Sequence, residues 1–300
     1  MKRTALKQFA LSALAASGFL PFIGHAAEPI PVVATFSILG DLVKVVGGDR
    51  VAVTTLAGPD ADAHEFNPSP AHAKAVFNAR LFVLNGLNFE PWAQKLAKSA
   101  GYKGDTVVAS QGVKPRQLAT ESGHTHGETD PHAWQNPLNV ILYVNNIASR
   151  LAKLDPSGAV KYRANAEVYA KQLRAFDAQA KSRFDAIAAD KRKVITSHDA
   201  FGYLSARYGI TMLAPEGIST DAEPSAKHVA ELIRQIKREE IKAVFVENMS
   251  NRKLIDQLSK DAGVTVGASL YSDALSDASG PASTYLKMMN HNLTQLVAGM

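Results

Sequence analysis

The chain has 300 residues, which is enough for one large domain or two smaller ones with a sizeable core. Its 46% hydrophobic and 20% charged residues exclude a collagenous, low-complexity or wholly disordered chain. There is no cysteine, so disulfides, thiolate metal sites, a cysteine nucleophile and a lipidated N-terminal cysteine are excluded as well. The formal charge of +5 includes three basic residues among the first seven, and without them it is only +2. We therefore expect no nucleic-acid partner.

Residues 1–26 have the pattern of a secretory signal peptide. Two lysines and an arginine precede the uncharged apolar run Phe9–Ile23, and small residues follow it up to Ala26 and Ala27. A run of about 15 apolar residues is shorter than the ~20 that a membrane-spanning helix requires. The pattern predicts export to the bacterial periplasm, because no cysteine is present for a lipid anchor. A secreted protein of a Gram-positive cell is the alternative.

Short β-branched runs and helical patterns alternate along the rest of the chain. In residues 27–156 the expected elements are the strand Pro31–Phe36, the helix Leu39–Val46, the strand Val51–Leu56, the helix Ser69–Arg80, the strand Leu81–Leu84, the helix Pro91–Ala100 and the strand Thr106–Ala109. In residues 191–300 they are the strand Lys193–Thr196, the helix Ala200–Tyr208, the strand Thr211–Ala214, the helix Ser225–Glu240, the strand Ala243–Val246, the helix Arg252–Ala262, the strand Val264–Ser269 and the helix Ser283–Val297. This alternation predicts an α/β fold of two lobes, each with a mostly parallel sheet and flanking helices.

The segment between the lobes, residues 157–190, is predicted to be one long helix. Its large apolar residues recur every three or four positions from Tyr162 to Ile187, and neither Gly nor Pro occurs from Ala159 onward. About 30 residues at 1.5 Å each span on the order of 45 Å, which is the length of two lobes. We expect a rigid spine helix that joins the lobes. A long helix within a single domain is the alternative.

Three histidines and one aspartate occupy similar places in the predicted fold. His64 follows the second strand and its loop, His198 follows a strand directly, and Asp273 follows the strand Val264–Ser269. Ligands of open α/β sheets bind beyond the carboxyl ends of the strands. His132 lies about midway between His64 and His198, and such wide spacing argues against a local finger, whose ligands come in tight pairs. The spacing suits a site with two ligands from each lobe, although four unrelated loop residues would look the same.

Four short segments stand out by their motifs. They are His64–Pro70 (HEFNPSP), Asp130–Trp134 (DPHAW), Ser197–Tyr203 (SHDAFGY) and Ser272–Asp273. Together with the predicted signal, lobes and spine, they resemble the metal-specific solute-binding proteins of bacterial ABC importers, from about Ile30 to the C-terminus. Asn67 and Asn136 depart from the residues usual in that family, but neither is an implied ligand.

The resemblance implies both a site and a function. It implies that His64, His132, His198 and Asp273 are the four ligands of one divalent metal ion held between the lobes. The implied function is that of a periplasmic receptor, expected to be a monomer, which delivers the ion to a membrane ABC permease and is not an enzyme.

The ligand set favours zinc. Three imidazoles and one carboxylate without a thiolate suit Zn²⁺ in tetrahedral geometry. Mn²⁺ is the alternative, because a bidentate carboxylate raises the coordination number. Manganese-carrying relatives often have Glu in the place of His198, and here that place holds histidine.

Two further histidines and two alternative functions remain open. His124 and His126 lie in the hydrophilic loop Thr120–Thr129, which is interpreted either as a short metal-gathering loop or as a solvated loop with incidental histidines. A secreted zinc hydrolase is the alternative from another class, although the chain has neither a His-Glu-x-x-His nor a Gly-x-Ser-x-Gly motif. A metal-binding surface adhesin is the third interpretation.

Overall fold

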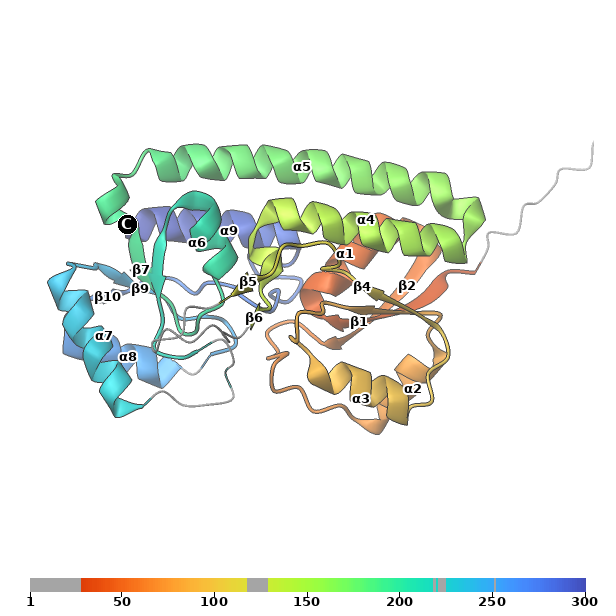
Figure 1. Ribbon diagram of the computed structural model, residues 1–300, viewed down its shortest axis with the longest axis horizontal. Coiled ribbons are helices and arrows are strands. Elements are labelled where there is room, and N and C mark those ends of the chain that lie inside the picture. The colour runs from red at the N-terminus through yellow and green to blue at the C-terminus, as the bar shows by residue number, and fades with distance from the viewer. Residues whose placement is uncertain (1–27, 118–128, 218–219, 221–224, 251) are drawn as a thin grey trace, which may run out of the picture.

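Two four-stranded parallel sheets form the framework of the computed structural model, which describes residues 28–117, 129–217, 220, 225–250 and 252–300 (Figure 1). The first sheet has the order β2-β1-β3-β4 and contains β1 (Ile30–Phe36), β2 (Val51–Ala57), β3 (Leu81–Leu84) and β4 (Asp105–Val108). The second has the order β10-β9-β7-β8 and contains β7 (Lys193–Ile195), β8 (Thr211–Leu213), β9 (Ala243–Val244) and β10 (Thr265–Val266). A short antiparallel pair, β5 (Arg116–Gln117) and β6 (Thr129–Asp130), lies between them in the sequence. The predicted two-lobe α/β fold is confirmed.

Helices cover both faces of each sheet. On one side, at the bottom of Figure 1, lie α2 (Pro70–Asn78) and α3 (Pro91–Ser99) under the first sheet, and α7 (Ala226–Arg238) and α8 (Arg252–Ala262) under the second. On the other side lie α1 (Ser37–Gly47), α4 (Pro137–Leu154), α5 (Ala159–Asp185), α6 (Gly202–Tyr208) and α9 (Tyr285–Gly299). Within the described part of the chain, no helix is both long and apolar enough to cross a membrane.

The alternation of side chains along the strands explains this layering. Successive residues of a strand point to opposite faces, so Val33 packs with the core under α2 and α3 while Ala34 joins the core under α1, α4 and α5. In the second sheet Ile195 packs toward α7 and α8, and Val194 toward α6 and α9. The core on the side of α1, α4, α5, α6 and α9 is one continuous apolar cluster that includes residues of both sheets and of α5. The two halves of the chain are therefore joined by a shared apolar core.

The long helix α5 runs across both sheets, as the predicted spine does (Figure 1). Its 27 residues correspond to about 40 Å of length. Toward the first sheet, Asn165 Nδ2 donates to the carbonyl of Val46 at 2.9 Å. Toward the second, Asp177 is buried and accepts from Arg207 Nε at 2.7 Å and from the Tyr208 hydroxyl at 3.1 Å. These bonds attach the helix to both halves.

One α-helix of the structure is absent from the predicted elements, and for that segment the prediction is wrong. Residues 137–154 form α4, which lies alongside α5 in Figure 1. The side chain of Asn136 caps this helix by accepting from Leu138 N at 3.0 Å, and Pro137 occupies its first turn. Its buried face, from Val140 to Leu151, recurs at helical spacing. Because α4 starts directly after the DPHAW segment, it fixes the position of His132.

Candidate metal centre

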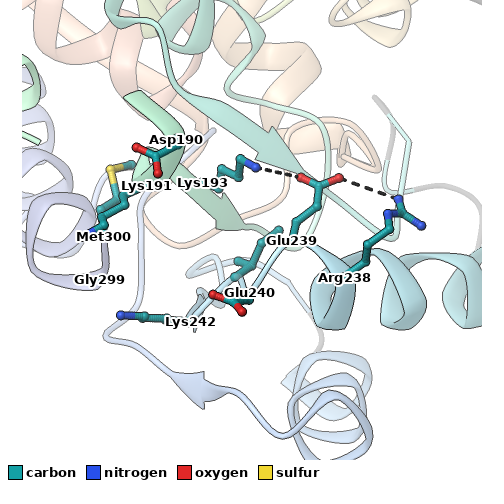
Figure 2. Close-up of a pocket in the computed structure, with 10 residues that line it drawn as sticks. Asp190, Lys191, Lys193, Arg238, Glu239, Glu240, Lys242, Gly299 and Met300 are labelled. Atoms are coloured by element: carbon teal, nitrogen blue, oxygen red, sulfur yellow. Dashed lines mark ion pairs between the residues drawn. The ribbon is translucent and has the colours of Figure 1, made fainter. Parts of the chain in front are cut away.

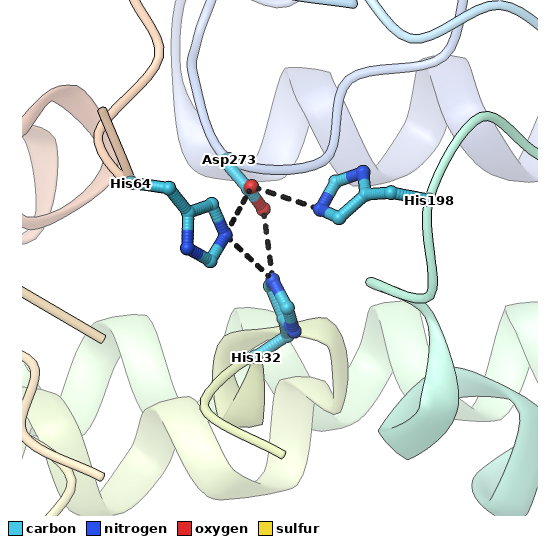
Figure 3. Close-up of side chains that lie close together, drawn as sticks. All are labelled: His64, His132, His198 and Asp273. Atoms are coloured by element: carbon cyan, nitrogen blue, oxygen red, sulfur yellow. Dashed lines mark hydrogen bonds and ion pairs between the residues drawn. The ribbon is translucent and has the colours of Figure 1, made fainter. Parts of the chain in front are cut away.

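Four side chains from distant parts of the chain meet between the two sheets (Figure 3). His64 lies in the loop between β2 and α2, and His132 lies between β6 and α4. His198 follows β7, and Asp273 lies in the segment between β10 and α9. The structure thus brings together all four of the residues implied as ligands, two from each half. His124 and His126 lie outside the described residues.

The donor atoms of this cluster are within reach of a single ion. Asp273 Oδ2 lies 3.2 Å from His64 Nε2 and 3.1 Å from His198 Nε2, while Asp273 Oδ1 lies 3.6 Å from His132 Nε2. The two Nε2 atoms of His64 and His132 are 3.2 Å apart, and all four donor atoms lie within 4.8 Å of one another. Donor atoms around a tetrahedral zinc ion are about 3.4 Å apart. The four separations given above lie close to this value, and donor atoms that are farther apart, up to 4.8 Å, would move closer around such an ion.

The cluster is almost completely removed from solvent. The side chains of His132, His198 and Asp273 are fully buried, and that of His64 is 6% exposed. Among the residues that the structure describes, His198 Nε2 and both oxygens of Asp273 are buried atoms without a hydrogen-bond partner. Burying a polar atom without a hydrogen-bond partner costs free energy of folding. A cation bound between these atoms would supply the missing interaction.

The His132 turn is held by a buried aspartate. Asp130 Oδ1 accepts a hydrogen bond from the His132 backbone N–H at 3.0 Å and lies 2.9 Å from ring atom Nδ1. Its other oxygen accepts from Arg116 Nη1 at 3.1 Å, on the neighbouring strand β5. Because Nδ1 faces Asp130, Nε2 faces the cluster. A carboxylate behind a ligating histidine orients the ring and strengthens it as a donor.

The His198 turn has a similar partner, Glu247, which follows β9. Glu247 Oε1 accepts from the backbone N–H groups of Ser197 and His198 at 2.9 and 3.0 Å. Its Oε2 lies 2.6 Å from His198 Nδ1. Glu247 is not among the residues predicted from the sequence, although it directly follows the predicted strand Ala243–Val246 and so lies at the carboxyl end of a strand, as His198 does.

The Asp273 segment is attached to the His132 turn. The carbonyl of Ser272 accepts from Trp134 Nε1 and Gln135 Nε2, each at 2.8 Å. Leu275 N donates to Ser37 Oγ at 2.9 Å, so the segment also contacts the first helix of the chain. Hydrogen bonds between side chains of the first half and the backbone around Asp273 therefore set the distance between His132 and Asp273.

An aromatic wall closes the side of the cluster that faces the first lobe. The ring centroid of Phe89 lies 4.6 Å from that of His64, 5.9 Å from that of His132 and 4.8 Å from that of Trp134. Phe89 and Trp134 are fully buried. Low polarity on this side strengthens electrostatic attraction inside the cluster, because the local dielectric constant is low.

Without a metal ion, the buried carboxylates favour protonated imidazoles. Burial opposes the charged form of His132, but the negative charges of Asp273 and Asp130 outweigh it and raise the pKa of His132 to about 9. Burial likewise opposes the charge on His198, yet Glu247 and Asp273 raise its pKa well above the usual value. Burial acts to raise the pKa of Asp273, but His132 and His198 lower it well below the usual range. Protons and a metal cation thus compete for the same atoms.

Apart from the cluster, a pocket lies at the edge of the second sheet where its strands begin, opposite the edge where His198 lies (Figure 2). It is lined by Lys191 and Lys193, at the start of β7, and by the ends of α7 and α9. Much of its charge is paired, since Glu239 lies 3.2 Å from Lys193 and 3.7 Å from Arg238. Ligands of parallel sheets bind at the carboxyl edge, where His198 lies, and not at this edge.

The fold and the cluster define a class of protein. Two α/β lobes that share a core and place loops around one buried cation-binding cluster have the architecture of a solute-binding protein. The family model described as "Zinc-uptake complex component A periplasmic" (ZnuA) matches residues 32–299, and the chain belongs to this family.

Relatives bind different metals according to their names. The iron ABC transporter substrate-binding lipoprotein MtsA of Streptococcus pyogenes is 33% identical over 279 residues, covering 91% of this chain and 89% of that protein. The periplasmic zinc binding protein TroA from Treponema pallidum has a TM-score of 0.84 at 29% identity, covering 91% of this chain and 99% of that chain. A Mn-bound periplasmic metal binding protein from Candidatus Liberibacter asiaticus has a TM-score of 0.81 at 30% identity, covering 90% and 99%. The chain is a metal-binding substrate-binding protein of the ABC-transporter type.

Proposed function

We propose that this protein captures one divalent metal ion, zinc in the first place, and delivers it to a membrane ABC permease. The observation that carries the proposal is the convergence of His64, His132, His198 and Asp273. Among the described residues, the buried donor atoms of His198 and Asp273 in this cluster have no hydrogen-bond partner. Two ligands come from each half of the chain, so a bound ion would cross-link the halves. His64 is the one ligand of the four with an exposed edge, which makes its loop the route by which an ion enters and leaves.

Zinc is supported by the donor set and by the separations. Three imidazole nitrogens and one carboxylate oxygen fill a tetrahedral shell, and zinc prefers nitrogen-rich sites more than manganese does. Manganese is the second candidate, and a specific observation favours it: both oxygens of Asp273 face histidines, Oδ2 toward His64 and His198 and Oδ1 toward His132. Bidentate binding by Asp273 would give five coordination.

A binding role is also supported over a hydrolytic one. Catalytic zinc is held by three protein ligands and keeps a fourth position for water. Four converging protein ligands leave no such position in a tetrahedral shell. Burial of the cluster, with only His64 partly exposed, would also hinder a polymeric substrate.

The test is the metal content of untagged protein purified without added metal. We expect one equivalent per chain, mainly zinc, and well below one equivalent in His132→Ala, which keeps only three of the four ligands. Chelator competition with Zn²⁺, Mn²⁺ and Fe²⁺ then ranks the ions for the same preparation. Absence of any tight site in the wild type at neutral pH would refute the proposal. If the protein binds manganese more tightly than zinc, manganese is the transported ion. Turnover of ester, peptide or phosphoester substrates would favour the alternative function, a secreted zinc hydrolase.

We also propose the processing and organisation of the chain. Residues 1–26 are a signal peptide that is removed on export to the periplasm, residues 27–156 and 191–300 form the lobes, and residues 157–190 form the spine. The mature protein acts as a monomer. Peptide mass analysis of the periplasmic fraction tests the cleavage site, and light scattering tests the oligomeric state.

A further inference from the structure

Glu247 is a buried carboxylate whose two side-chain oxygens both contact the Ser197–His198 turn. It is 1% exposed, and Oε1 accepts from both backbone N–H groups of the Ser197–His198 turn. Its own backbone N–H donates to Ser197 Oγ at 3.1 Å. The remaining oxygen, Oε2, lies 2.6 Å from His198 Nδ1. Nδ1 is on the side of the ring away from Nε2, so Glu247 lies behind the ligand and not in the cluster.

The contact of Glu247 with the ring decides which nitrogen of His198 is free. A carboxylate only accepts hydrogen bonds, so in the neutral ring, the form that binds a metal ion, Oε2 requires the proton on Nδ1 and leaves the lone pair on Nε2. Nε2 is the atom that lies 3.1 Å from Asp273 Oδ2. The contact between Oε2 and Nδ1 is short but poorly aligned, since neither atom has a hydrogen bond of good geometry among the described residues. An ion on Nε2 would fix the ring in place.

From these contacts we infer that Glu247 is a positioning residue for metal binding, which holds His198 in the tautomer that coordinates through Nε2. This inference rests on the proposed function. Partners of this kind typically contribute about 10–100-fold to metal affinity.

A purely structural role for Glu247 makes a different prediction. If the carboxylate only satisfies the Ser197 and His198 backbone N–H groups, Gln in its place serves as well, because the amide oxygen accepts both bonds. The amide NH₂ would then face Nδ1 and donate to it, which moves the ring proton to Nε2 and blocks coordination. If the amide is turned the other way, NH₂ meets two N–H donors. The near-isosteric Glu247→Gln therefore separates the two roles.

Glu90→Gln is the matched control. Glu90 is also buried, at 5% exposure, and accepts through Oε1 from the backbone N–H of Asn85 and from Thr35 Oγ1. It makes no described contact with any of the four donor side chains. Both variants exchange a buried carboxyl group for an amide, so any loss of folding stability that such an exchange causes is common to both.

The experiment measures zinc affinity of wild type, Glu247→Gln and Glu90→Gln by chelator competition, with thermal unfolding of the metal-free proteins as a check on folding. We expect about a 10–100-fold loss in Glu247→Gln and less than about a twofold change in Glu90→Gln. Equal affinity of Glu247→Gln and wild type overturns the inference and leaves the proposed function intact. No tight zinc in the wild type overturns the proposed function itself.

A second measurement needs no variant. Long-range ¹H–¹⁵N correlation spectra of the zinc-loaded wild type report the tautomer of each histidine ring. We expect His198 to carry its proton on Nδ1, with the downfield shift of a hydrogen bond to a carboxylate, and zinc on Nε2. Zinc on Nδ1, or an Nδ1 proton that exchanges freely with water, would show that Glu247 does not hold the ring.

Discussion

Loading the site with one zinc ion at pH 7 is expected to release about two protons, and the number follows from the buried charges. Asp273, Asp130 and Glu247 are all at most 1% exposed, and their three negative charges face the histidines. Arg116, paired with Asp130 at 3.1 Å, offsets one of them. A divalent cation balances the remaining two charges when the imidazoles are neutral.

In the metal-free protein, protons on the imidazole rings balance these negative charges. The carboxylates raise the pKa of His132 to about 9 against the opposing effect of burial, and they raise that of His198 well above its usual value. His132 is therefore mainly protonated at pH 7, and the raised pKa of His198 favours the protonated ring in the same way. Removing the proton from a group with a pKa two units above the solution pH costs roughly 3 kcal/mol, so proton competition at His132 lowers zinc affinity at pH 7 by on the order of 100-fold relative to pH above 9.

Titration calorimetry in buffers with different ionisation enthalpies measures this proton release directly. The slope of the observed enthalpy against buffer enthalpy should correspond to about two protons per zinc at pH 7 and should decrease above pH 9. A slope near zero at pH 7 would refute the reasoning, because it would mean that both rings are already neutral in the metal-free protein.

The same pKa shift predicts how stability depends on pH. The pKa of His132 in the folded protein lies above the unfolded value of about 6.5, so its ion pairs stabilise the metal-free protein fully below pH 6.5. That contribution is lost as the pH rises through about 9. Thermal unfolding should therefore show the melting temperature of metal-free protein decreasing from pH 6.5 to 9, with a widening gap to the zinc-loaded form. A constant gap would contradict the assigned shift.

Three further predictions test the ligands, the loop and the contact between the lobes. His198→Glu should narrow the ratio of zinc to manganese affinity without reversing it, and His198→Ala should lose more zinc affinity, in competition titrations; equal zinc affinity in all three proteins would exclude His198 as a ligand. Deleting residues 121–128 should leave the tight site intact and remove any weaker second equivalent in calorimetry; loss of the tight site would refute a gathering role. Asp60 has a φ of 53°, and its side chain accepts a hydrogen bond from Asn248 of the other lobe at 2.7 Å. Asp60→Gly removes this bond with a residue that tolerates the same φ, so it should speed zinc release to a chelator by about two- to tenfold. An unchanged release rate would show that the bond does not hold the lobes together.

Part of the fold and site could be predicted because it depends on local patterns. Strand–helix alternation placed His64, His198 and Asp273 after predicted strands, but only the resemblance to a known family implied that they and His132 form one ligand set. The structure brings the four side chains together. The helix α4 was missed although Asn136 and Pro137 mark its start, because the strand before it, β6, has only two residues and leaves no β-branched run in the sequence.

Other features depend on contacts that no sequence spacing expresses. The role of Glu247 arises from its position 2.6 Å from His198 Nδ1, which β9 and β7 bring about by pairing in one sheet. The raised pKa of His132 likewise depends on burial beside two carboxylates from different segments. These distances are set by the packing of the whole fold.

X-ray absorption spectroscopy of the zinc-loaded protein tests the central claim most directly, because it reports the atoms bound to the ion. The account predicts three imidazole nitrogens and one or two carboxylate oxygens at about 2.0–2.2 Å, with one imidazole lost in His132→Ala. A shell of mainly water oxygens, or fewer than three imidazoles in the wild type, would contradict it.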